Sequence, residues 1–157
     1  QGRWVNVDSQ APNQAAEEWL RTGPLGWPVS RIQREVFFGD SRFDFYLEGE
    51  QGERAFLEVK GVTLEVDGVA RFPDAPTERG VRHIHHLMKA REEGYRAYLL
   101  FVIQMKGVER WEPNWETHPA FGEAVREAAA AGVQVLAMDC RVWPRGMALD
   151  APVPCSF

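Results

Sequence analysis

Residues 42–60 read RFDFYLEGEQGERAFLEVK, and this stretch decides the fold. Apolar and polar side chains alternate over residues 42–48, which is typical of a strand with one buried face. Residues 49–53 are polar and contain two glycines, so they predict a hairpin turn. Residues 54–64 predict a longer second strand. The stretch therefore predicts two antiparallel strands joined by a short turn.

The same hairpin carries three charged residues whose chemistry fits together. Side chains two positions apart in a strand share a face, so Glu58 and Lys60 are expected to point the same way, with Asp44 opposite them. Carboxylates, together with a backbone carbonyl such as that of Val59, are ligands for hard divalent cations. The pattern predicts a Mg²⁺ or Mn²⁺ site in which Lys60 positions an attacking water or stabilises developing negative charge.

Another interpretation of the hairpin needs no metal. An Asp followed by Glu-x-Lys arises often by chance. The charges would then form a solvated ladder across the hairpin, to which Glu58 and Lys60 contribute cross-strand pairing of roughly a few tenths of a kcal/mol. The apolar residues around these charges favour a function, because burying ions without a metal or a partner costs free energy. Glu18, in the first predicted helix, is either a third carboxylate ligand or an exposed helix residue.

The rest of the chain predicts an α/β domain. Thr77 is expected to cap a long helix that ends near Gly94. The apolar run at residues 97–103 predicts a central strand that is covered on both faces. Strands followed by alternating helices and strands predict a mixed sheet flanked by helices. The other expected elements are strands at 31–38 and 133–138, helices at 11–22 and 119–131, and an irregular tail from Trp143.

Composition narrows the possible functions. The 157 residues suffice for one domain with a real core. The formal net charge of -5 argues against a simple high-affinity DNA-binding module, but less against a nuclease, whose basic surface can be local. Residues 97–103 form the longest apolar run, which is shorter than the roughly 20 residues that span a bilayer. With no secretion signal and two cysteines outside any metal-ligand spacing, a cytoplasmic protein with reduced thiols is expected.

Several stretches together point to a known family. Residues 41–45 read SRFDF, residues 58–64 read EVKGVTL and residues 72–80 read FPDAPTERG. Shorter matching stretches are VNVD at 5–8, PN at 12–13, LLFV at 99–102 and GMAL at 146–149. In this order the chain resembles the sugar fermentation stimulation protein family (SfsA) from near residue 5 to its end. The stretch at 72–80 is its most distinctive part.

The resemblance implies a nuclease-like domain of the restriction-endonuclease-like, PD-(D/E)XK type over residues 1–157. In the family an OB-fold domain precedes this part. By the resemblance, this chain begins where that N-terminal domain would be ending, so residues 1–10 are expected to be the junction with it. Gly61 stands where Ser is usual in the family and Pro76 where Val is common. Neither departure is expected to remove the metal site.

The resemblance also implies roles for single residues. By position, Asp44 takes the role of the metal-binding aspartate, Glu58 that of the second acid and Lys60 that of the catalytic lysine. Glu18 falls where such folds often place a helical glutamate. Members of the family are described as DNA-binding, so DNA is the expected partner.

Polar residues around the long helix are candidates for nucleic-acid contact. His83, His85 and His86 would be either zinc ligands or an edge that is solvated or faces phosphate, and no second ligand set at metal spacing supports zinc. Glu78 and Arg79 would contact the metal shell or a phosphate, or else serve as caps and ion-pair partners. The predicted contacts are Arg42, Glu78, Arg79, Arg82 and His83.

The sequence therefore favours a Mg²⁺- or Mn²⁺-dependent nuclease that hydrolyses phosphodiester bonds of DNA. The alternative is a non-catalytic regulator of sugar-metabolism genes that uses a nuclease-like fold only to bind DNA. The three charged groups of the hairpin argue against that alternative, because a site without catalysis has no need of all three. A sugar-binding protein rests on the family's name only.

Overall fold

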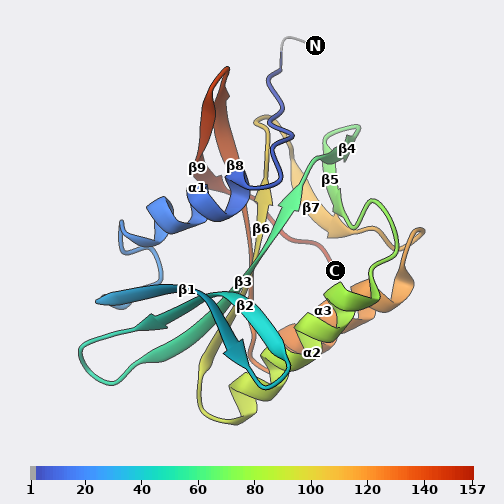
Figure 1. Ribbon diagram of the computed structural model, residues 1–157. Coiled ribbons are helices and arrows are strands. Elements are labelled where there is room, and N and C mark those ends of the chain that lie inside the picture. Colours follow the sequence, from blue (N-terminus) through green and yellow to red (C-terminus); the bar gives the residue numbers. More distant parts are fainter. Residues whose placement is uncertain (1–2) are drawn as a thin grey trace.

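A six-stranded sheet with helices on both faces forms the body of the protein (Figure 1). The computed structural model describes residues 3–157, so residues 1 and 2 of the expected junction lie outside the described part. The helices are α1 (Ala11–Leu20), α2 (Glu78–Glu92) and α3 (Pro119–Ala130). The strands of the main sheet are β1 (Arg31–Phe38), β2 (Ser41–Glu48), β3 (Arg54–Val62), β6 (Arg96–Ile103), β8 (Gln134–Trp143) and β9 (Gly146–Pro152). A second sheet contains β4 (Leu64–Val66), β5 (Val69–Phe72) and β7 (Arg110–Pro113).

The main sheet is mixed, and its strand order is β1-β2-β3-β6-β8-β9. Strands β1, β2 and β3 are antiparallel neighbours, as the alternating hairpin pattern predicts. Strands β3, β6 and β8 are parallel, and β9 returns antiparallel along the outer edge. The predicted α/β class, with a mixed sheet flanked by helices, is thus confirmed. The central position of β6 also agrees with its apolar sequence.

Each face of the sheet has its own hydrophobic core. Side chains of β6 alternate between them, with Leu99 and Phe101 on one face and Tyr98 and Leu100 on the other. We call the first the α2–α3 core, because residues of α2 and α3 pack into it. The second, into which α1 packs, is the α1 core. Because β6 is buried on both faces, its position is fixed by packing, and this also fixes the position of the strands that pair with it.

Helix α2 begins where its sequence predicts. Thr77 is the N-cap residue, and its side-chain oxygen accepts a hydrogen bond from the Gly80 N–H at 3.0 Å. Ile84 and Leu87 are fully buried one turn apart, which fixes the face that α2 turns to the sheet. His83 precedes Ile84 on this buried side and is 7% exposed. The first turns of α2 therefore lie against the strands of the hairpin.

Two regions that were predicted as a loop or an irregular tail are strands in the structure. The tail from Trp143 is not irregular, because β8 continues to Trp143 and β9 pairs with it antiparallel. Pro152 fits there, since β9 is an outer strand in which a missing N–H is tolerated. The segment around Trp111 is strand β7 rather than a loop. Trp111 is fully buried and stacks on Phe101, with the ring centroids 3.9 Å apart.

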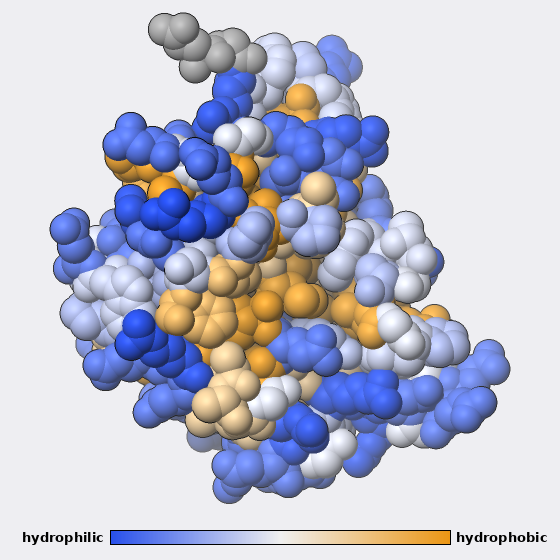
Figure 2. Space-filling model, turned by 180° about the vertical axis from the view of Figure 1, so that it is seen from behind, coloured by the Kyte–Doolittle hydropathy of each residue, from blue (hydrophilic) through white to orange (hydrophobic). Residues whose placement is uncertain are grey.

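The view from behind shows apolar residues gathered near the middle of that face, surrounded by hydrophilic ones (Figure 2). An apolar hollow of about 370 Å³ lies beside β8, between Trp19 and Val153, and no charged side chain of the described residues lines it. No helix in residues 3–157 has both the length and the apolar character needed to cross a membrane. The charged hollows described below are separate from this apolar one.

Candidate metal centre

The site forms where the pairing of β2 with β3 ends. Phe45 and Leu57 are the last paired residues toward this end of the hairpin. Asp44 and Glu58 come next in register, and no main-chain pairing continues to them. Because buried N–H groups need an acceptor, the end of the ladder leaves main-chain donors for side chains to satisfy.

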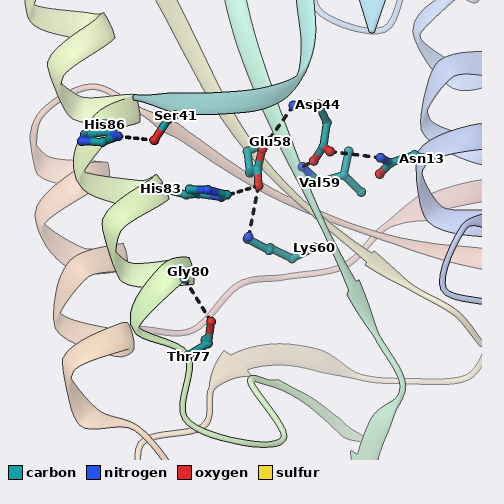
Figure 3. Close-up of polar contacts among 10 residues, drawn as sticks. All are labelled: Asn13, Ser41, Asp44, Glu58, Val59, Lys60, Thr77, Gly80, His83 and His86. Carbon is teal, nitrogen blue, oxygen red and sulfur yellow. Dashed lines mark hydrogen bonds and ion pairs between the residues drawn. The ribbon is translucent and has the colours of Figure 1, made fainter. Parts of the chain in front are cut away.

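The two carboxylates accept these N–H groups in a reciprocal arrangement (Figure 3). The main-chain N–H of Asp44 donates to Oε1 of Glu58, with 3.2 Å between nitrogen and oxygen. The main-chain N–H of Val59 donates to Oδ2 of Asp44 at 2.7 Å. Each acid is thus oriented by the backbone of the other strand. The backbone, rather than a flexible side chain, holds the two carboxylates side by side.

Side chains from both helical layers complete the cluster. Asn13 of α1 donates its Nδ2 to Oδ1 of Asp44 at 3.0 Å. Lys60 donates its Nζ to Oε2 of Glu58 at 3.1 Å, and Nδ1 of His83 lies 2.9 Å from the same oxygen. Asp44 points toward α1 and Glu58 toward α2 (Figure 3). The cluster therefore bridges the two layers at one end of the hairpin.

A change in strand alternation accompanies the orientation of Asp44. Residues two apart in a strand normally share a face, yet Phe45 packs in the α1 core and Phe43 in the α2–α3 core. Glu35 of β1 lies across from Asp44 in register and has a φ of 56°. A positive φ is unusual for a residue other than glycine and often marks a functional position. The hairpin thus changes face at its first acid.

The electrostatics of the two acids differ. Burial, and then the charge of Glu58, raises the pKa of Asp44 from 3.8 to about 6. Burial also acts to raise the pKa of Glu58, but its hydrogen bond with His83 and the charge of Lys60 outweigh this, and the pKa is lowered. Glu58 is therefore a stable anion, whereas ionised Asp44 has no cationic partner of its own among the residues that the structure describes. A divalent cation would supply that partner.

The donor set at this point fits a hard divalent cation. Asp44 and Glu58 offer carboxylate oxygens, and both line a hollow. In a strand, the N–H and C=O of one residue point to the same side, so the carbonyl of Val59 faces the side of Asp44, to which its N–H donates. Among residues 3–157, no three His, Cys, Asp or Glu side chains are grouped to hold a metal. A cation here would therefore rely on two carboxylates, a carbonyl and water, as Mg²⁺ sites often do.

Two hollows meet at the carboxylates. One has a volume of about 530 Å³ and extends past Lys60 to Thr63 and Gln104. The other has a volume of about 310 Å³ and extends to Arg34 and Arg42. The residues that line both are Ser9, Asn13, Asp44, Glu58, Arg79 and His83. A ligand in either hollow therefore reaches the same pair of acids.

Comparison with known proteins identifies the family. Residues 10–146 match the family model described as "Sugar fermentation stimulation protein RE domain". The chain belongs to the SfsA family. It is 51% identical over 140 residues to a sugar fermentation stimulation protein homolog from Desulfitobacterium hafniense, which covers 89% of this chain and 60% of the relative. A homolog from Clostridium botulinum is 46% identical over 151 residues, covering 95% and 66%. The chain thus spans about three fifths of the length of its curated relatives.

A solved structure of the SfsA family has the same fold. It is described as "The structure of Pyrococcus Furiosus SfsA in complex with Ca2+". The alignment has a TM-score of 0.91 at 28% identity and covers 100% of this chain and 69% of that one. The mixed sheet and three helices described above are therefore similar to those of an SfsA protein.

The predicted site residues of this SfsA-family chain fall into two groups. Asp44, Glu58, Val59 and Lys60 come together at the end of the β2–β3 ladder. Around them, Arg42 and Arg79 line the hollows, and His83 is buried against Glu58 rather than facing outward. The residues that line neither hollow, and are exposed, are Glu78 and Arg82 of α2 and Glu18 of α1.

Helix geometry explains the position of Glu18. It follows Asn13 by five residues, which turns it by about 140° around the helix axis. Asn13 faces Asp44, so Glu18 faces away and lines a different hollow with Asp8 and Arg145. The structure therefore does not bring Glu18 to the site as a third carboxylate.

Asn13 is the site residue that the sequence reasoning missed. A single Asn in a helix has no distinctive chemistry, and only its membership of the Pro12-Asn13 pair in the family resemblance marked it. His83 was predicted as an outward contact, because its spacing gives no sign that Glu58 would lie beside it. Both residues form hydrogen bonds with carboxylates of elements far apart from them in sequence. The periodicity of a single strand or helix cannot show such contacts.

Proposed function

We propose that this chain is a Mg²⁺- or Mn²⁺-dependent nuclease that hydrolyses phosphodiester bonds of DNA, on a restriction-endonuclease-like, PD-(D/E)XK fold. The observation that carries the proposal is the convergence of Asp44, Glu58 and Lys60 at the end of the β2–β3 ladder. Two acids and an ammonium at one point suit phosphate chemistry, because the acids hold a cation and the ammonium faces developing negative charge.

The residues would divide the work as follows. Asp44, Glu58 and the Val59 carbonyl would hold the cation, which when bound polarises water and neutralises charge on the phosphate. Asn13 and His83 hold one oxygen of each acid and so orient the pair. Lys60 Nζ, tethered by Glu58 and 14% exposed, would direct a hydrogen bond to the attacking water or to a phosphate oxygen.

A relative supports the choice of cation. The Pyrococcus furiosus SfsA structure is described as a complex with Ca²⁺. Calcium and magnesium share a preference for hard oxygen ligands, although magnesium requires a tighter, octahedral shell. Carboxylates and a carbonyl at the end of the β2–β3 ladder suit either cation in this chain.

Arginines at the rim suit a polyanionic substrate. Arg79 is exposed, lines both hollows and lies in the first turn of α2, where the helix terminus also favours anions. Arg42 lines the second hollow. Guanidinium groups bind phosphate in a bidentate manner, so these two residues are proposed to contact the DNA backbone. Their charge is local, which reconciles a DNA substrate with the net charge of -5.

The test is cleavage of end-labelled DNA by the wild type and by Asp44→Ala and Lys60→Ala, with Mg²⁺ or Mn²⁺ present. We expect cleavage by the wild type and loss of cleavage in both variants, with folding checked by circular dichroism. Glu18→Ala is the matched control, because this exposed carboxylate lines neither hollow, and its activity should equal that of the wild type. If DNA is bound yet never cut with any of several metals, the protein is instead a DNA-binding regulator.

A further inference from the structure

We propose that this site cuts internal bonds of a continuous nucleic-acid strand and does not need a strand end. The inference rests on the proposed nuclease function and specifies its substrate. It follows from where the acids lie relative to the two hollows, from the polar groups on either side of them and from the ion pairs at the rim.

The two acids lie at the junction of the hollows. Asp44 and Glu58 line both, whereas Thr63 and Gln104 lie only in the first and Arg34 and Arg42 only in the second. A site that removes terminal nucleotides needs its reacting groups at the end of a hollow that receives the strand end. Here space continues from the acids into two hollows with different linings, so a strand can enter through one hollow and leave through the other.

Both sides also offer groups that suit a nucleic-acid backbone. Thr63 supplies an exposed neutral hydroxyl donor in the first hollow, while Arg34 and Arg42 supply guanidinium groups in the second. Side-chain and main-chain donors of these kinds make most contacts to phosphate and sugar in nucleic-acid complexes. The backbone on either side of the central phosphate would therefore find hydrogen-bond donors.

The arginines of the second hollow are held only loosely by protein acids. Arg34 pairs with Glu17 at 3.1 Å with its side chain 42% exposed. Arg42 pairs with Glu35 at 3.5 Å with 50% exposed. Exposed ion pairs of this kind contribute little to stability, so a phosphate can replace the acid. Arg34 and Arg42 can thus release their acids and bind phosphates when nucleic acid enters the second hollow.

The test compares a covalently closed circular single-stranded DNA, a covalently closed circular duplex and linear forms of both sequences, with Mn²⁺ and wild-type protein. We expect circles to be cut at rates within about threefold of the linear forms, with internal products from the linear forms. Stepwise shortening of linear DNA from an end, with circles left intact, would overturn the inference while leaving the nuclease proposal standing. If no form is cut, the nuclease proposal fails and the inference with it.

A double variant distinguishes the loss of phosphate binding in the second hollow from a general effect on folding. Arg34→Ala together with Arg42→Ala should raise KM for circular DNA about tenfold or more, leave kcat within about twofold and reduce the salt dependence of binding. Arg31→Ala is the matched control. Arg31 is an exposed arginine of β1, the strand of Arg34, and it lines neither hollow. An equal change in the control, or no change in the double variant, would contradict the proposed role of the second hollow.

Discussion

Among residues 3–157 two acids are buried, Glu58 and Asp139, and the charged clusters around them differ in how their charges are balanced. In one, Asp139 is 7% exposed and accepts two hydrogen bonds from Lys106 Nζ, at 3.0 and 2.9 Å, and one from the Ala151 N–H at 2.9 Å. Asp150 also pairs with Lys106, and this contact lowers the pKa of Asp150 and raises that of Lys106. In this cluster both acids have Lys106 as a cationic partner.

The cluster at the hollows is different. Glu58 pairs with both Lys60 and His83. Among the described residues, Asp44 therefore accepts hydrogen bonds only from neutral groups, and its charged neighbour is the anion Glu58. Its pKa rises to about 6, chiefly because of burial and then because of Glu58. A fold has no structural need for an acid placed so unfavourably. The Lys106 cluster therefore stabilises the fold, whereas the Asp44 cluster keeps an unfavourable charge, which the proposed cation would neutralise.

The largest expected difference between the clusters concerns catalysis. Lys60→Ala should lower the rate of DNA cleavage by at least about 100-fold, because it removes the group that faces the water or the phosphate. Lys106→Ala should leave the rate unchanged and lower stability instead, because Asp139 then loses its main partner. Initial cleavage rates and urea unfolding of both variants measure this. Similar losses of activity in the two would mean that neither lysine acts directly.

A second difference concerns stability without metal. Asp44→Asn should raise the free energy of unfolding at pH 8 by about 2 kcal/mol, because it removes a poorly solvated charge and keeps an acceptor for the Val59 N–H. Asp139→Asn should lower it by about 1–2 kcal/mol, because Lys106 and the Ala151 N–H lose a charged acceptor. Urea unfolding in the presence of a chelator distinguishes the two.

The sign of this effect follows from linkage. The folded-state pKa of Asp44, about 6, lies above its ordinary value of 3.8, so the folded protein binds the proton more tightly than the unfolded chain. The stability of the wild type relative to Asp44→Asn should therefore fall as pH rises from about 4 to about 6 and stay constant above. If Asp44→Asn is less stable than the wild type at pH 8 without metal, the account of this cluster is wrong.

The smallest expected effect comes from Asn13. Asn13→Ala should weaken Mn²⁺ binding about tenfold, because the side chain fixes Oδ1 of Asp44 without contacting substrate. Gln14→Ala is the control. Gln14 directly follows Asn13 in α1 and is exposed, so this variant should bind Mn²⁺ as the wild type does. Calorimetric titration gives both affinities. The Asn13 role is contradicted if the two variants bind Mn²⁺ equally.

Much of the fold follows from local sequence patterns. The alternation over residues 42–48, the apolar run of β6 and the Thr77 cap each have a local cause, and the structure contains all three elements. Strands β7 and β9 were not predicted, because Trp and Pro in short segments resemble loops until a partner strand is known. Pairing partners are a long-range property that no local period reveals.

The candidate site divides in the same way. The register of the hairpin places Asp44 across from Glu58, as the sequence predicts. The change of face at Asp44 was not predictable, since it accompanies a positive φ at Glu35 in another strand. Asn13 and His83 reach the acids from helices on opposite faces of the sheet. Such contacts depend on how the layers stack, which the sequence pattern of one element does not contain.

The central claim is that Asp44 and Glu58 hold a divalent cation, and calorimetric titration with Mn²⁺ and Mg²⁺ tests it most directly. Wild-type protein and Asp139→Asn should bind one ion per chain with the same affinity, whereas Asp44→Ala should show no binding. Asp139→Asn controls for the loss of any buried acid. Binding that persists in Asp44→Ala, or that is absent from the folded wild type, would contradict the account.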